Sequence, residues 1–136
     1  MNLSSSGVIS GTPTTSGAYT FTVHLVDSSP TPKAVTSGSL TLTVLPKPPT
    51  NLIASPQGPG IVTLTWTPST SGDIESYNIH QGTSSAVYTT VISAGNVNQY
   101  VEFGLTSGQQ MYFVVAAVSA SGVESVVSNE VTTIVP

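Results

Sequence analysis

Apolar residues alternate with hydroxyl-bearing residues along most of this chain. Leu40, Leu42 and Val44, for example, are separated by Thr41 and Thr43. A spacing of two places every second side chain on the same face of an extended strand. No stretch shows the i, i+3, i+4, i+7 spacing of an amphipathic helix. The alternation therefore predicts an all-β protein.

Three prolines within residues 46–49 interrupt the alternation. Proline cannot donate a ladder hydrogen bond in a central strand, and proline-rich runs favour stiff, extended connections. We therefore predict a first module over residues 1–45, a linker over 46–49 and a second module over 50–136.

The first module is predicted to contain strands at 18–26 and 40–44, a short strand around Val8 and Ile9, and a loop over 27–33. His24 falls on the face of its strand that is exposed to water. The opposite, apolar face of the two longer strands consists of Tyr19, Phe21, Val23, Leu25, Leu40, Leu42 and Val44.

Seven strands are predicted in the second module, a number typical of a β-sandwich. One strand places Tyr77 and Ile79 on one face and Asn78 and His80 on the other. The predicted strands cover 52–54, 61–66, 77–80, 87–92, 99–103, 111–118 and 128–134.

The second module also carries a set of residues whose order and spacing are characteristic of one family. These residues are Pro49, Leu52, Trp66, Tyr77, Leu105, Ala117, Gly122, Ser128 and Val131. From Pro48 to Pro136 the chain thus resembles a fibronectin type III domain of the bacterial secreted kind, which implies an immunoglobulin-like β-sandwich.

One position departs from this family pattern. Met111 stands where the family usually has a tyrosine whose hydroxyl bonds to the backbone at a corner of the sandwich. We therefore expect that hydrogen bond to be missing and the corner to depend on packing. On the same register Met111, Phe113, Val115 and Ala117 face the core.

The first module resembles a different family. It carries Leu3-Ser-Ser-Ser-Gly-Val-Ile-Ser-Gly-Thr-Pro, followed by Gly17-Ala-Tyr-Thr-Phe-Thr-Val and Val26-Asp-Ser-Ser. These motifs resemble the second half of the immunoglobulin-like, cadherin-related repeats of bacterial surface proteins. The resemblance implies that earlier strands cover the ones seen here, so we expect the chain to begin inside a domain.

Such a partial module would leave its apolar face uncovered. Burial of one large apolar side chain contributes about 1.5–3 kcal/mol, so exposing a whole face is costly. Our hypothesis is that this face either packs on the second module or is covered by another copy of the chain in a homodimer.

The charge content excludes several functions. The chain has two lysines, no arginine and six acidic residues, and its net charge is −4. Two lysines cannot provide the basic surface of a nucleic-acid binder. No apolar run is long enough for a membrane helix, so we expect no direct membrane insertion. The chain has no cysteine, which excludes disulfides and Cys-based zinc sites.

Nothing in the sequence predicts catalysis or a cofactor. His24 and Asp27 lie near a strand end without a nucleophile-bearing turn, and His80 alternates outward from its strand. Asp27 is better explained by a turn-forming role. We therefore predict that the chain is not an enzyme.

Two weak binding sites are considered. Asp73 and Glu75 could offer oxygen ligands to calcium, although calcium requires about six to eight oxygens. Tyr88, Tyr100 and Tyr112 are the rings left to form a sugar-binding platform, but they are scattered.

The strand at 111–118 is apolar on its outer face as well. This face carries Tyr112, Val114, Ala116 and Val118. We expect contact with a neighbouring module or subunit there, in preference to a tolerated exposed patch.

The sequence thus favours tandem non-catalytic modules that act as a spacer, adhesion or protein-interaction segment of a larger bacterial protein. Its 21 serines and 20 threonines, together with the family resemblances, favour a secreted or cell-surface location. The expected partners are other modules of the parent protein and a surface protein or polysaccharide. The alternative is a carbohydrate-binding accessory module of a secreted polysaccharide-acting enzyme.

Overall fold

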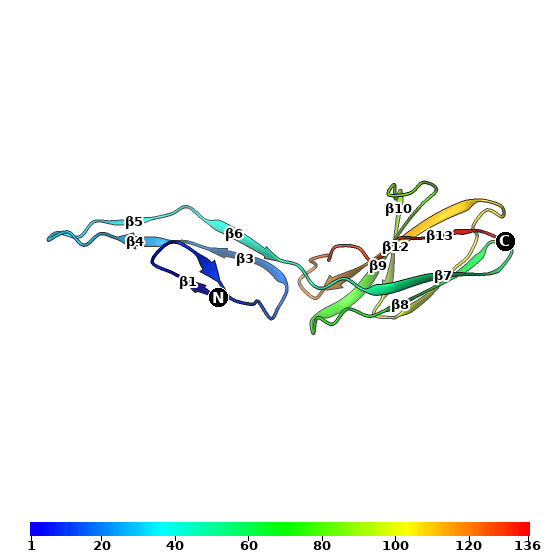
Figure 1. The fold of residues 1–136 in the computed structure, drawn as a ribbon, viewed down its shortest axis with the longest axis horizontal. Coiled ribbons are helices and arrows are strands. Elements are labelled where there is room, and N and C mark those ends of the chain that lie inside the picture. The colour runs from blue at the N-terminus through cyan, green and yellow to red at the C-terminus, as the bar shows by residue number, and fades with distance from the viewer.

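The computed structural model describes residues 1–136 and contains thirteen strands and no helix. The molecule is elongated, with a β-sandwich at one end and a narrow arm of paired strands at the other (Figure 1). We refer to β1–β6 as the arm and to β7–β13 as the sandwich. The all-β prediction is confirmed.

The sandwich consists of two antiparallel sheets. The four-stranded sheet has the order β10 (Thr90–Gly95), β9 (Ile74–Gly82), β12 (Gln110–Ser119) and β13 (Val131–Ile134). The three-stranded sheet has the order β11 (Gln99–Glu102), β8 (Ile61–Thr67) and β7 (Thr50–Gly58). The predicted number of strands is confirmed.

The inner faces of the two sheets form one core. Trp66 and Tyr77 meet there with ring centroids 5.6 Å apart. Met111 is buried at the position of the family's corner tyrosine, so packing replaces the hydroxyl at that corner. The core consists of Leu52, Val62, Leu64, Trp66, Tyr77, Ile79, Met111, Phe113, Val115, Ala117 and Val135.

Two strands of the sandwich begin later than predicted. The last strand was expected from residue 128 but begins at Val131, because serine side chains interrupt the ladder before it. Ser128 Oγ accepts a hydrogen bond from Val115 N at 3.0 Å, and Ser125 Oγ accepts one from Ala117 N at 2.9 Å. The strand expected from residue 87 begins at Thr90, because Val87 N bonds to Ser84 O within a turn.

The arm consists of three two-stranded pairs. β3 (Gly17–Phe21) pairs with β6 (Leu40–Val44), β4 (His24–Val26) pairs with β5 (Ala34–Thr36), and β1 (Asn2–Leu3) pairs with β2 (Ile9–Ser10).

The arm differs from the prediction in two ways. The strand predicted over residues 18–26 is interrupted after Phe21, where Val23 N donates to Ser37 Oγ at 2.9 Å in place of a regular ladder bond. β1 and β5 were not predicted, because two or three residues are too few to show an alternation.

The apolar face of the arm remains largely open. Tyr19 lies opposite Leu42, Phe21 opposite Leu40, and Leu25 opposite Val35. No strand of the arm pairs with a strand of the sandwich, and the arm extends away from it (Figure 1). The first of the two expected coverings, packing of this face on the second module, is therefore wrong.

The two phenylalanines of the sandwich provide a test of its core. Phe113 is 0% exposed and Phe103 is 66% exposed. We expect Phe113→Ala to lower the free energy of unfolding by about 3–5 kcal/mol, because it leaves a cavity between the sheets. Phe103→Ala should change it by less than about 0.5 kcal/mol. Urea unfolding followed by Trp66 fluorescence measures both, and equal effects of the two substitutions would contradict this placement of the core.

Candidate functional site at the module junction

The arm is attached to the sandwich by one carboxylate. Asp73 Oδ2 accepts hydrogen bonds from Ser16 N at 2.8 Å and from Ser16 Oγ at 2.5 Å. Ser16 immediately precedes β3, and Asp73 immediately precedes β9, so the bond joins the residues that lead into two strands. The Ser16 hydroxyl and then its N–H lower the pKa of Asp73, because both donors favour the ionised carboxylate.

A second loop of the sandwich reaches the same turn of the arm. Ser121 Oγ donates to Ser16 O at 3.3 Å and lies 2.9 Å from Ser119 Oγ. Gly17 suits this turn because its φ is 150°, a backbone conformation that residues with a Cβ rarely adopt. Ser16 and Gly17 are buried as a result.

The linker is fixed on the same end of the sandwich. Lys47 N donates to Ser71 Oγ at 2.9 Å, and Ala120 N donates to Asp73 O at 2.9 Å. The prolines of the linker further restrict its backbone. The arm is therefore held at two places, by the linker and by Ser16, which limits rotation of one module against the other.

The structure assigns Asp73 a role that the sequence did not reveal. The sequence suggested it as a calcium ligand with Glu75, but Oδ2 is bonded to Ser16 and Glu75 is exposed. No three His, Cys, Asp or Glu side chains gather anywhere in the chain. The calcium site therefore stays a prediction. A bond between residues 57 apart leaves no local signal from which the junction could have been found.

The candidates for catalysis lie far from this junction. His24 is exposed on β4. Asp27 Oδ1 instead accepts bonds from Ser29 N, Ser29 Oγ and Lys33 N, at 3.2, 2.7 and 3.0 Å. The Lys33 N–H contributes most to lowering the pKa of Asp27. This is the turn-forming role that the sequence suggested for Asp27.

The outer face of β12, where contact with a neighbouring module or subunit was predicted, is partly covered by the chain itself. Val114 and Ala116 are 1% and 0% exposed, and Tyr112 and Val118 are half-buried. Val114 lies opposite His80 and Ala116 opposite Asn78. Val114 and Ala116 are therefore closed to a neighbour, and contact through Tyr112 and Val118 stays a prediction.

Glu124 bonds to both of these β9 side chains. Its Oε1 lies 2.7 Å from His80 Nε2 and accepts a bond from Asn78 Nδ2 at 3.5 Å. His80 and Asn78 are the residues opposite Val114 and Ala116. Polar side chains of β9 thus lie beside short apolar ones of β12, a relation that period-two alternation within a single strand cannot reveal.

Glu130 holds the loop between β9 and β10. Its carboxylate accepts bonds from Ser85 Oγ at 2.7 Å, Ala86 N at 2.8 Å and Tyr88 Oη at 2.5 Å. Ala86 has a φ of 59°, a strained value for a residue with a Cβ. Burial and Glu130 raise the pKa of Tyr88 to about 12. The Tyr88 hydroxyl contributes most to lowering the pKa of Glu130.

The three tyrosines suggested for sugar binding do not form one platform. Tyr100 is on β11 in the three-stranded sheet and packs against the core. Tyr112 is on β12 in the other sheet, and Tyr88 lies in the loop before β10 with its hydroxyl bonded to Glu130. Their rings therefore lie on separate elements of the sandwich.

Burial disfavours the ionised form of the Glu102 side chain. It is half-buried at the end of β11, and Gln81 Nε2 donates to its Oε1 at 3.5 Å. Burial raises its pKa more than the bond from Gln81 lowers it. Glu102 thus differs from Glu130 in the sign of its pKa shift.

From the contacts at the junction we predict that Asp73 fixes the angle between the arm and the sandwich. Asp73→Ala removes both acceptor bonds to Ser16, so we expect a wider distribution of orientations. The chain has no native cysteine, so dyes attached through Thr41→Cys on β6 and Ser93→Cys on β10 report this by single-molecule energy transfer. Asp27→Ala, which removes a similarly bonded carboxylate at the far end of the arm, is the matched control. Equal broadening in both variants would refute the role of Asp73.

We predict that the contributions of Glu102 and Glu130 to stability respond to pH in opposite directions. A depressed pKa such as that of Glu130 adds stability above its unfolded pKa, and this is lost as pH falls through the folded pKa. A raised pKa such as that of Glu102 adds stability below its unfolded pKa, and this is lost as pH rises through the folded pKa. At neutral pH Glu130→Gln should lower Tm and Glu102→Gln should raise it. In acid, the Tm of each variant should approach that of the unsubstituted chain. Tm shifts of the same sign for the two variants at neutral pH would contradict the opposite pKa shifts.

Comparison with known proteins supports the fold of the sandwich. The family model described as "Fibronectin type III domain" matches residues 47–134. A solved Fn3-like protein from Clostridium thermocellum is 33% identical, with a TM-score of 0.60, over 68% of this chain and 96% of its own. No curated protein sequence matches the chain.

More distant structures share the fold alone. The FN5 domain of Drosophila Lar is 19% identical, with a TM-score of 0.55, over 68% of this chain and 98% of its own. The chicken CNTN1 FN1–FN3 domains are 14% identical, with a TM-score of 0.61, over 89% of this chain and 43% of their own. The family match over residues 47–134 and the seven-stranded sandwich show that the chain belongs to the fibronectin type III family.

Proposed function

We propose that this chain is a spacer and protein-interaction segment of a larger bacterial protein that is secreted or displayed at the cell surface. A fibronectin type III domain is a non-catalytic β-sandwich module for spacing or interaction, and the finer assignment rests on the junction. The hydrogen bonds of Ser16 to Asp73 and of Lys47 to Ser71 hold the arm and the sandwich as one extended unit. A spacer requires this property, because it must keep the groups at its two ends apart.

The ends of the molecule are consistent with this role. The C-terminus lies at the end of the sandwich farthest from the arm (Figure 1). Further modules joined there would continue the long axis and would not fold back on it. No helix of the structure is long and apolar enough to span a membrane.

The charge distribution disfavours polyanionic partners. No lysine lies within ion-pair distance of a carboxylate, and the net charge is −4 with both histidines neutral. Adhesion to a polyanion would be opposed by this charge. The proposed partners are other modules of the parent protein and a surface protein. A carbohydrate-binding accessory role has less support, since Tyr88, Tyr100 and Tyr112 lie on separate elements.

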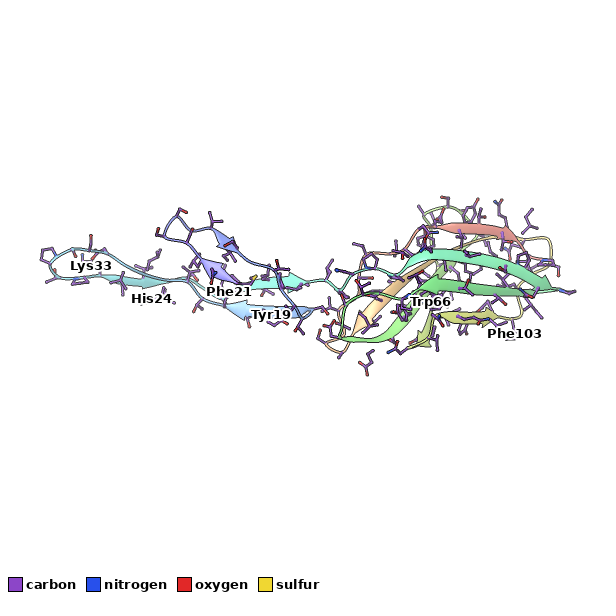
Figure 2. All side chains as sticks on the ribbon, turned by 60° about the horizontal axis from the view of Figure 1, so that its bottom comes forward. Tyr19, Phe21, His24, Lys33, Trp66 and Phe103 are labelled. Atoms are coloured by element: carbon purple, nitrogen blue, oxygen red, sulfur yellow. The ribbon has the colours of Figure 1, made fainter.

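A binding assay separates a spacer from a carbohydrate-binding module. We expect the chain to show no saturable binding on a glycan array or by calorimetry with neutral polysaccharides. A carbohydrate-binding module would show a Kd in the micromolar range. It would lose this binding on Tyr88→Ala, Tyr100→Ala or Tyr112→Ala. Phe103→Ala removes a ring at the end of the sandwich distant from the arm (Figure 2) and serves as the control.

A further inference from the structure

One edge strand of the sandwich is open to pairing with a further strand. β10 hydrogen-bonds on one side to β9 and forms an outer edge of the four-stranded sheet. It contains no proline and no charged residue, and most of its residues are exposed. Its one irregularity is a register shift between Ser93 and Gly95, near its end. An uncharged, exposed edge of this kind is a template for strand addition.

The other edges of the sandwich are protected. β7 contains Pro56, and the Asn129 side chain bonds to both the N–H and the C=O of Leu52 within that strand. β13 is short and packs beside β7. β11 is also short and carries the charged Glu102. Proline, short length and charge all oppose strand addition, so β10 is the edge most open to a partner.

Two polar side chains behind this edge lack a complete set of partners. Gln81 on β9 is 8% exposed, and its Nε2 donates to Glu102 Oε1 at 3.5 Å, which joins the two sheets. Gln81 Oε1 is buried and has no hydrogen-bond partner. Glu102 has no cation within ion-pair distance, and burial raises its pKa. A buried acceptor without a donor is costly, so a cationic donor placed here would stabilise both oxygens.

The register of the sheet connects these side chains to the edge. Gln81 lies opposite Thr90 of β10 and opposite Phe113 of β12, so all three side chains are on the core face. A strand added to β10 would place the residue opposite Thr90 on that same face. It would lie about 4.8 Å beyond β10, a spacing that the long side chain of lysine or arginine can span toward Gln81 and Glu102.

The neighbouring position indicates the rest of the partner strand. A residue opposite Val91 would lie on the outer face of the sheet, where Val91 is 55% exposed, so an apolar side chain suits that position. β10 of a second copy cannot supply the cation, because it carries no charge. The occupant that fits is therefore an extended segment of another protein, with a basic residue next to an apolar one.

We propose that β10 is a docking edge for an extended segment of a partner protein, in which a lysine or arginine opposite Thr90 binds Glu102 and Gln81. The segment adds a further strand to the four-stranded sheet through backbone hydrogen bonds. Its basic side chain supplies the donors that the two oxygens lack. This docking rests on the interaction role proposed above and gives the chemistry of its partner.

Selection of peptides from a random, phage-displayed library on the full chain tests the proposal. Enriched peptides should share one lysine or arginine beside an apolar residue. Methylation of alternate backbone nitrogens should abolish the binding of an enriched peptide in one of the two possible phases only, because one edge of the added strand pairs with β10. No enrichment, enriched peptides without a basic residue, or equal effects of the two methylation phases would overturn the proposal.

A double-mutant cycle with an enriched peptide, measured by calorimetry, tests the role of Glu102. Glu102→Gln should raise the peptide Kd about tenfold, and so should replacement of the peptide's basic residue by norleucine. Both changes together should cost little more than either alone, because each removes the same ion pair. Glu75→Gln removes an exposed carboxylate at the other end of β9 and should leave the Kd unchanged. Additive effects, or equal weakening by the two glutamine variants, would contradict the ion pair.

Two further outcomes would assign the edge differently. Self-association of the chain that Glu102→Gln abolishes in sedimentation would give the edge to a second copy and overturn the proposal. Failure to bind any peptide, in a chain whose arm and sandwich keep one orientation by energy transfer, would also overturn it but would leave the spacer function intact.

Discussion

A β-sheet with one apolar face is stable only when a second layer covers that face, and this requirement separates the two parts of the molecule. In the sandwich each sheet covers the other, and Trp66, Tyr77 and Phe113 are fully enclosed. The arm repeats the same alternation in Tyr19 and Leu42, but only the short β1–β2 pair lies over it. The strands of both parts have the same alternation of apolar and polar residues. The two parts differ in whether a second sheet covers the apolar face.

In this chain, serine hydroxyls form many of the polar tertiary contacts that charged side chains form in other proteins. The junction depends on Ser16, Ser71 and Ser121, and the last strand is preceded by Ser125 and Ser128, which bond directly to the backbone of β12. No lysine forms an ion pair with a carboxylate. Hydrogen bonds between uncharged groups are not screened by salt, so most of these contacts should persist at high ionic strength.

The sequence allowed the strands and the core faces of the sandwich to be predicted, because the alternation around Tyr77 and Ile79 is a local property of one strand. Local spacing could not reveal contacts between distant residues. Asp73 binds Ser16 and Glu130 binds Tyr88 across long stretches of sequence, and neither pair follows a recognisable motif. The burial of Val114 and Ala116 was missed for the same reason, since the residues opposite them, His80 and Asn78, belong to another strand, β9.

The orientation of the strands has a mechanical consequence. β7 begins at the arm and runs along the sandwich, and the chain leaves at the opposite end after β13 (Figure 1). A pull between the arm and Pro136 would act nearly parallel to these strands. Ladder hydrogen bonds lie perpendicular to the strand direction, so such a force would shear many of them at once and would not unzip them singly. The sandwich is thus oriented to resist stretching along its own axis.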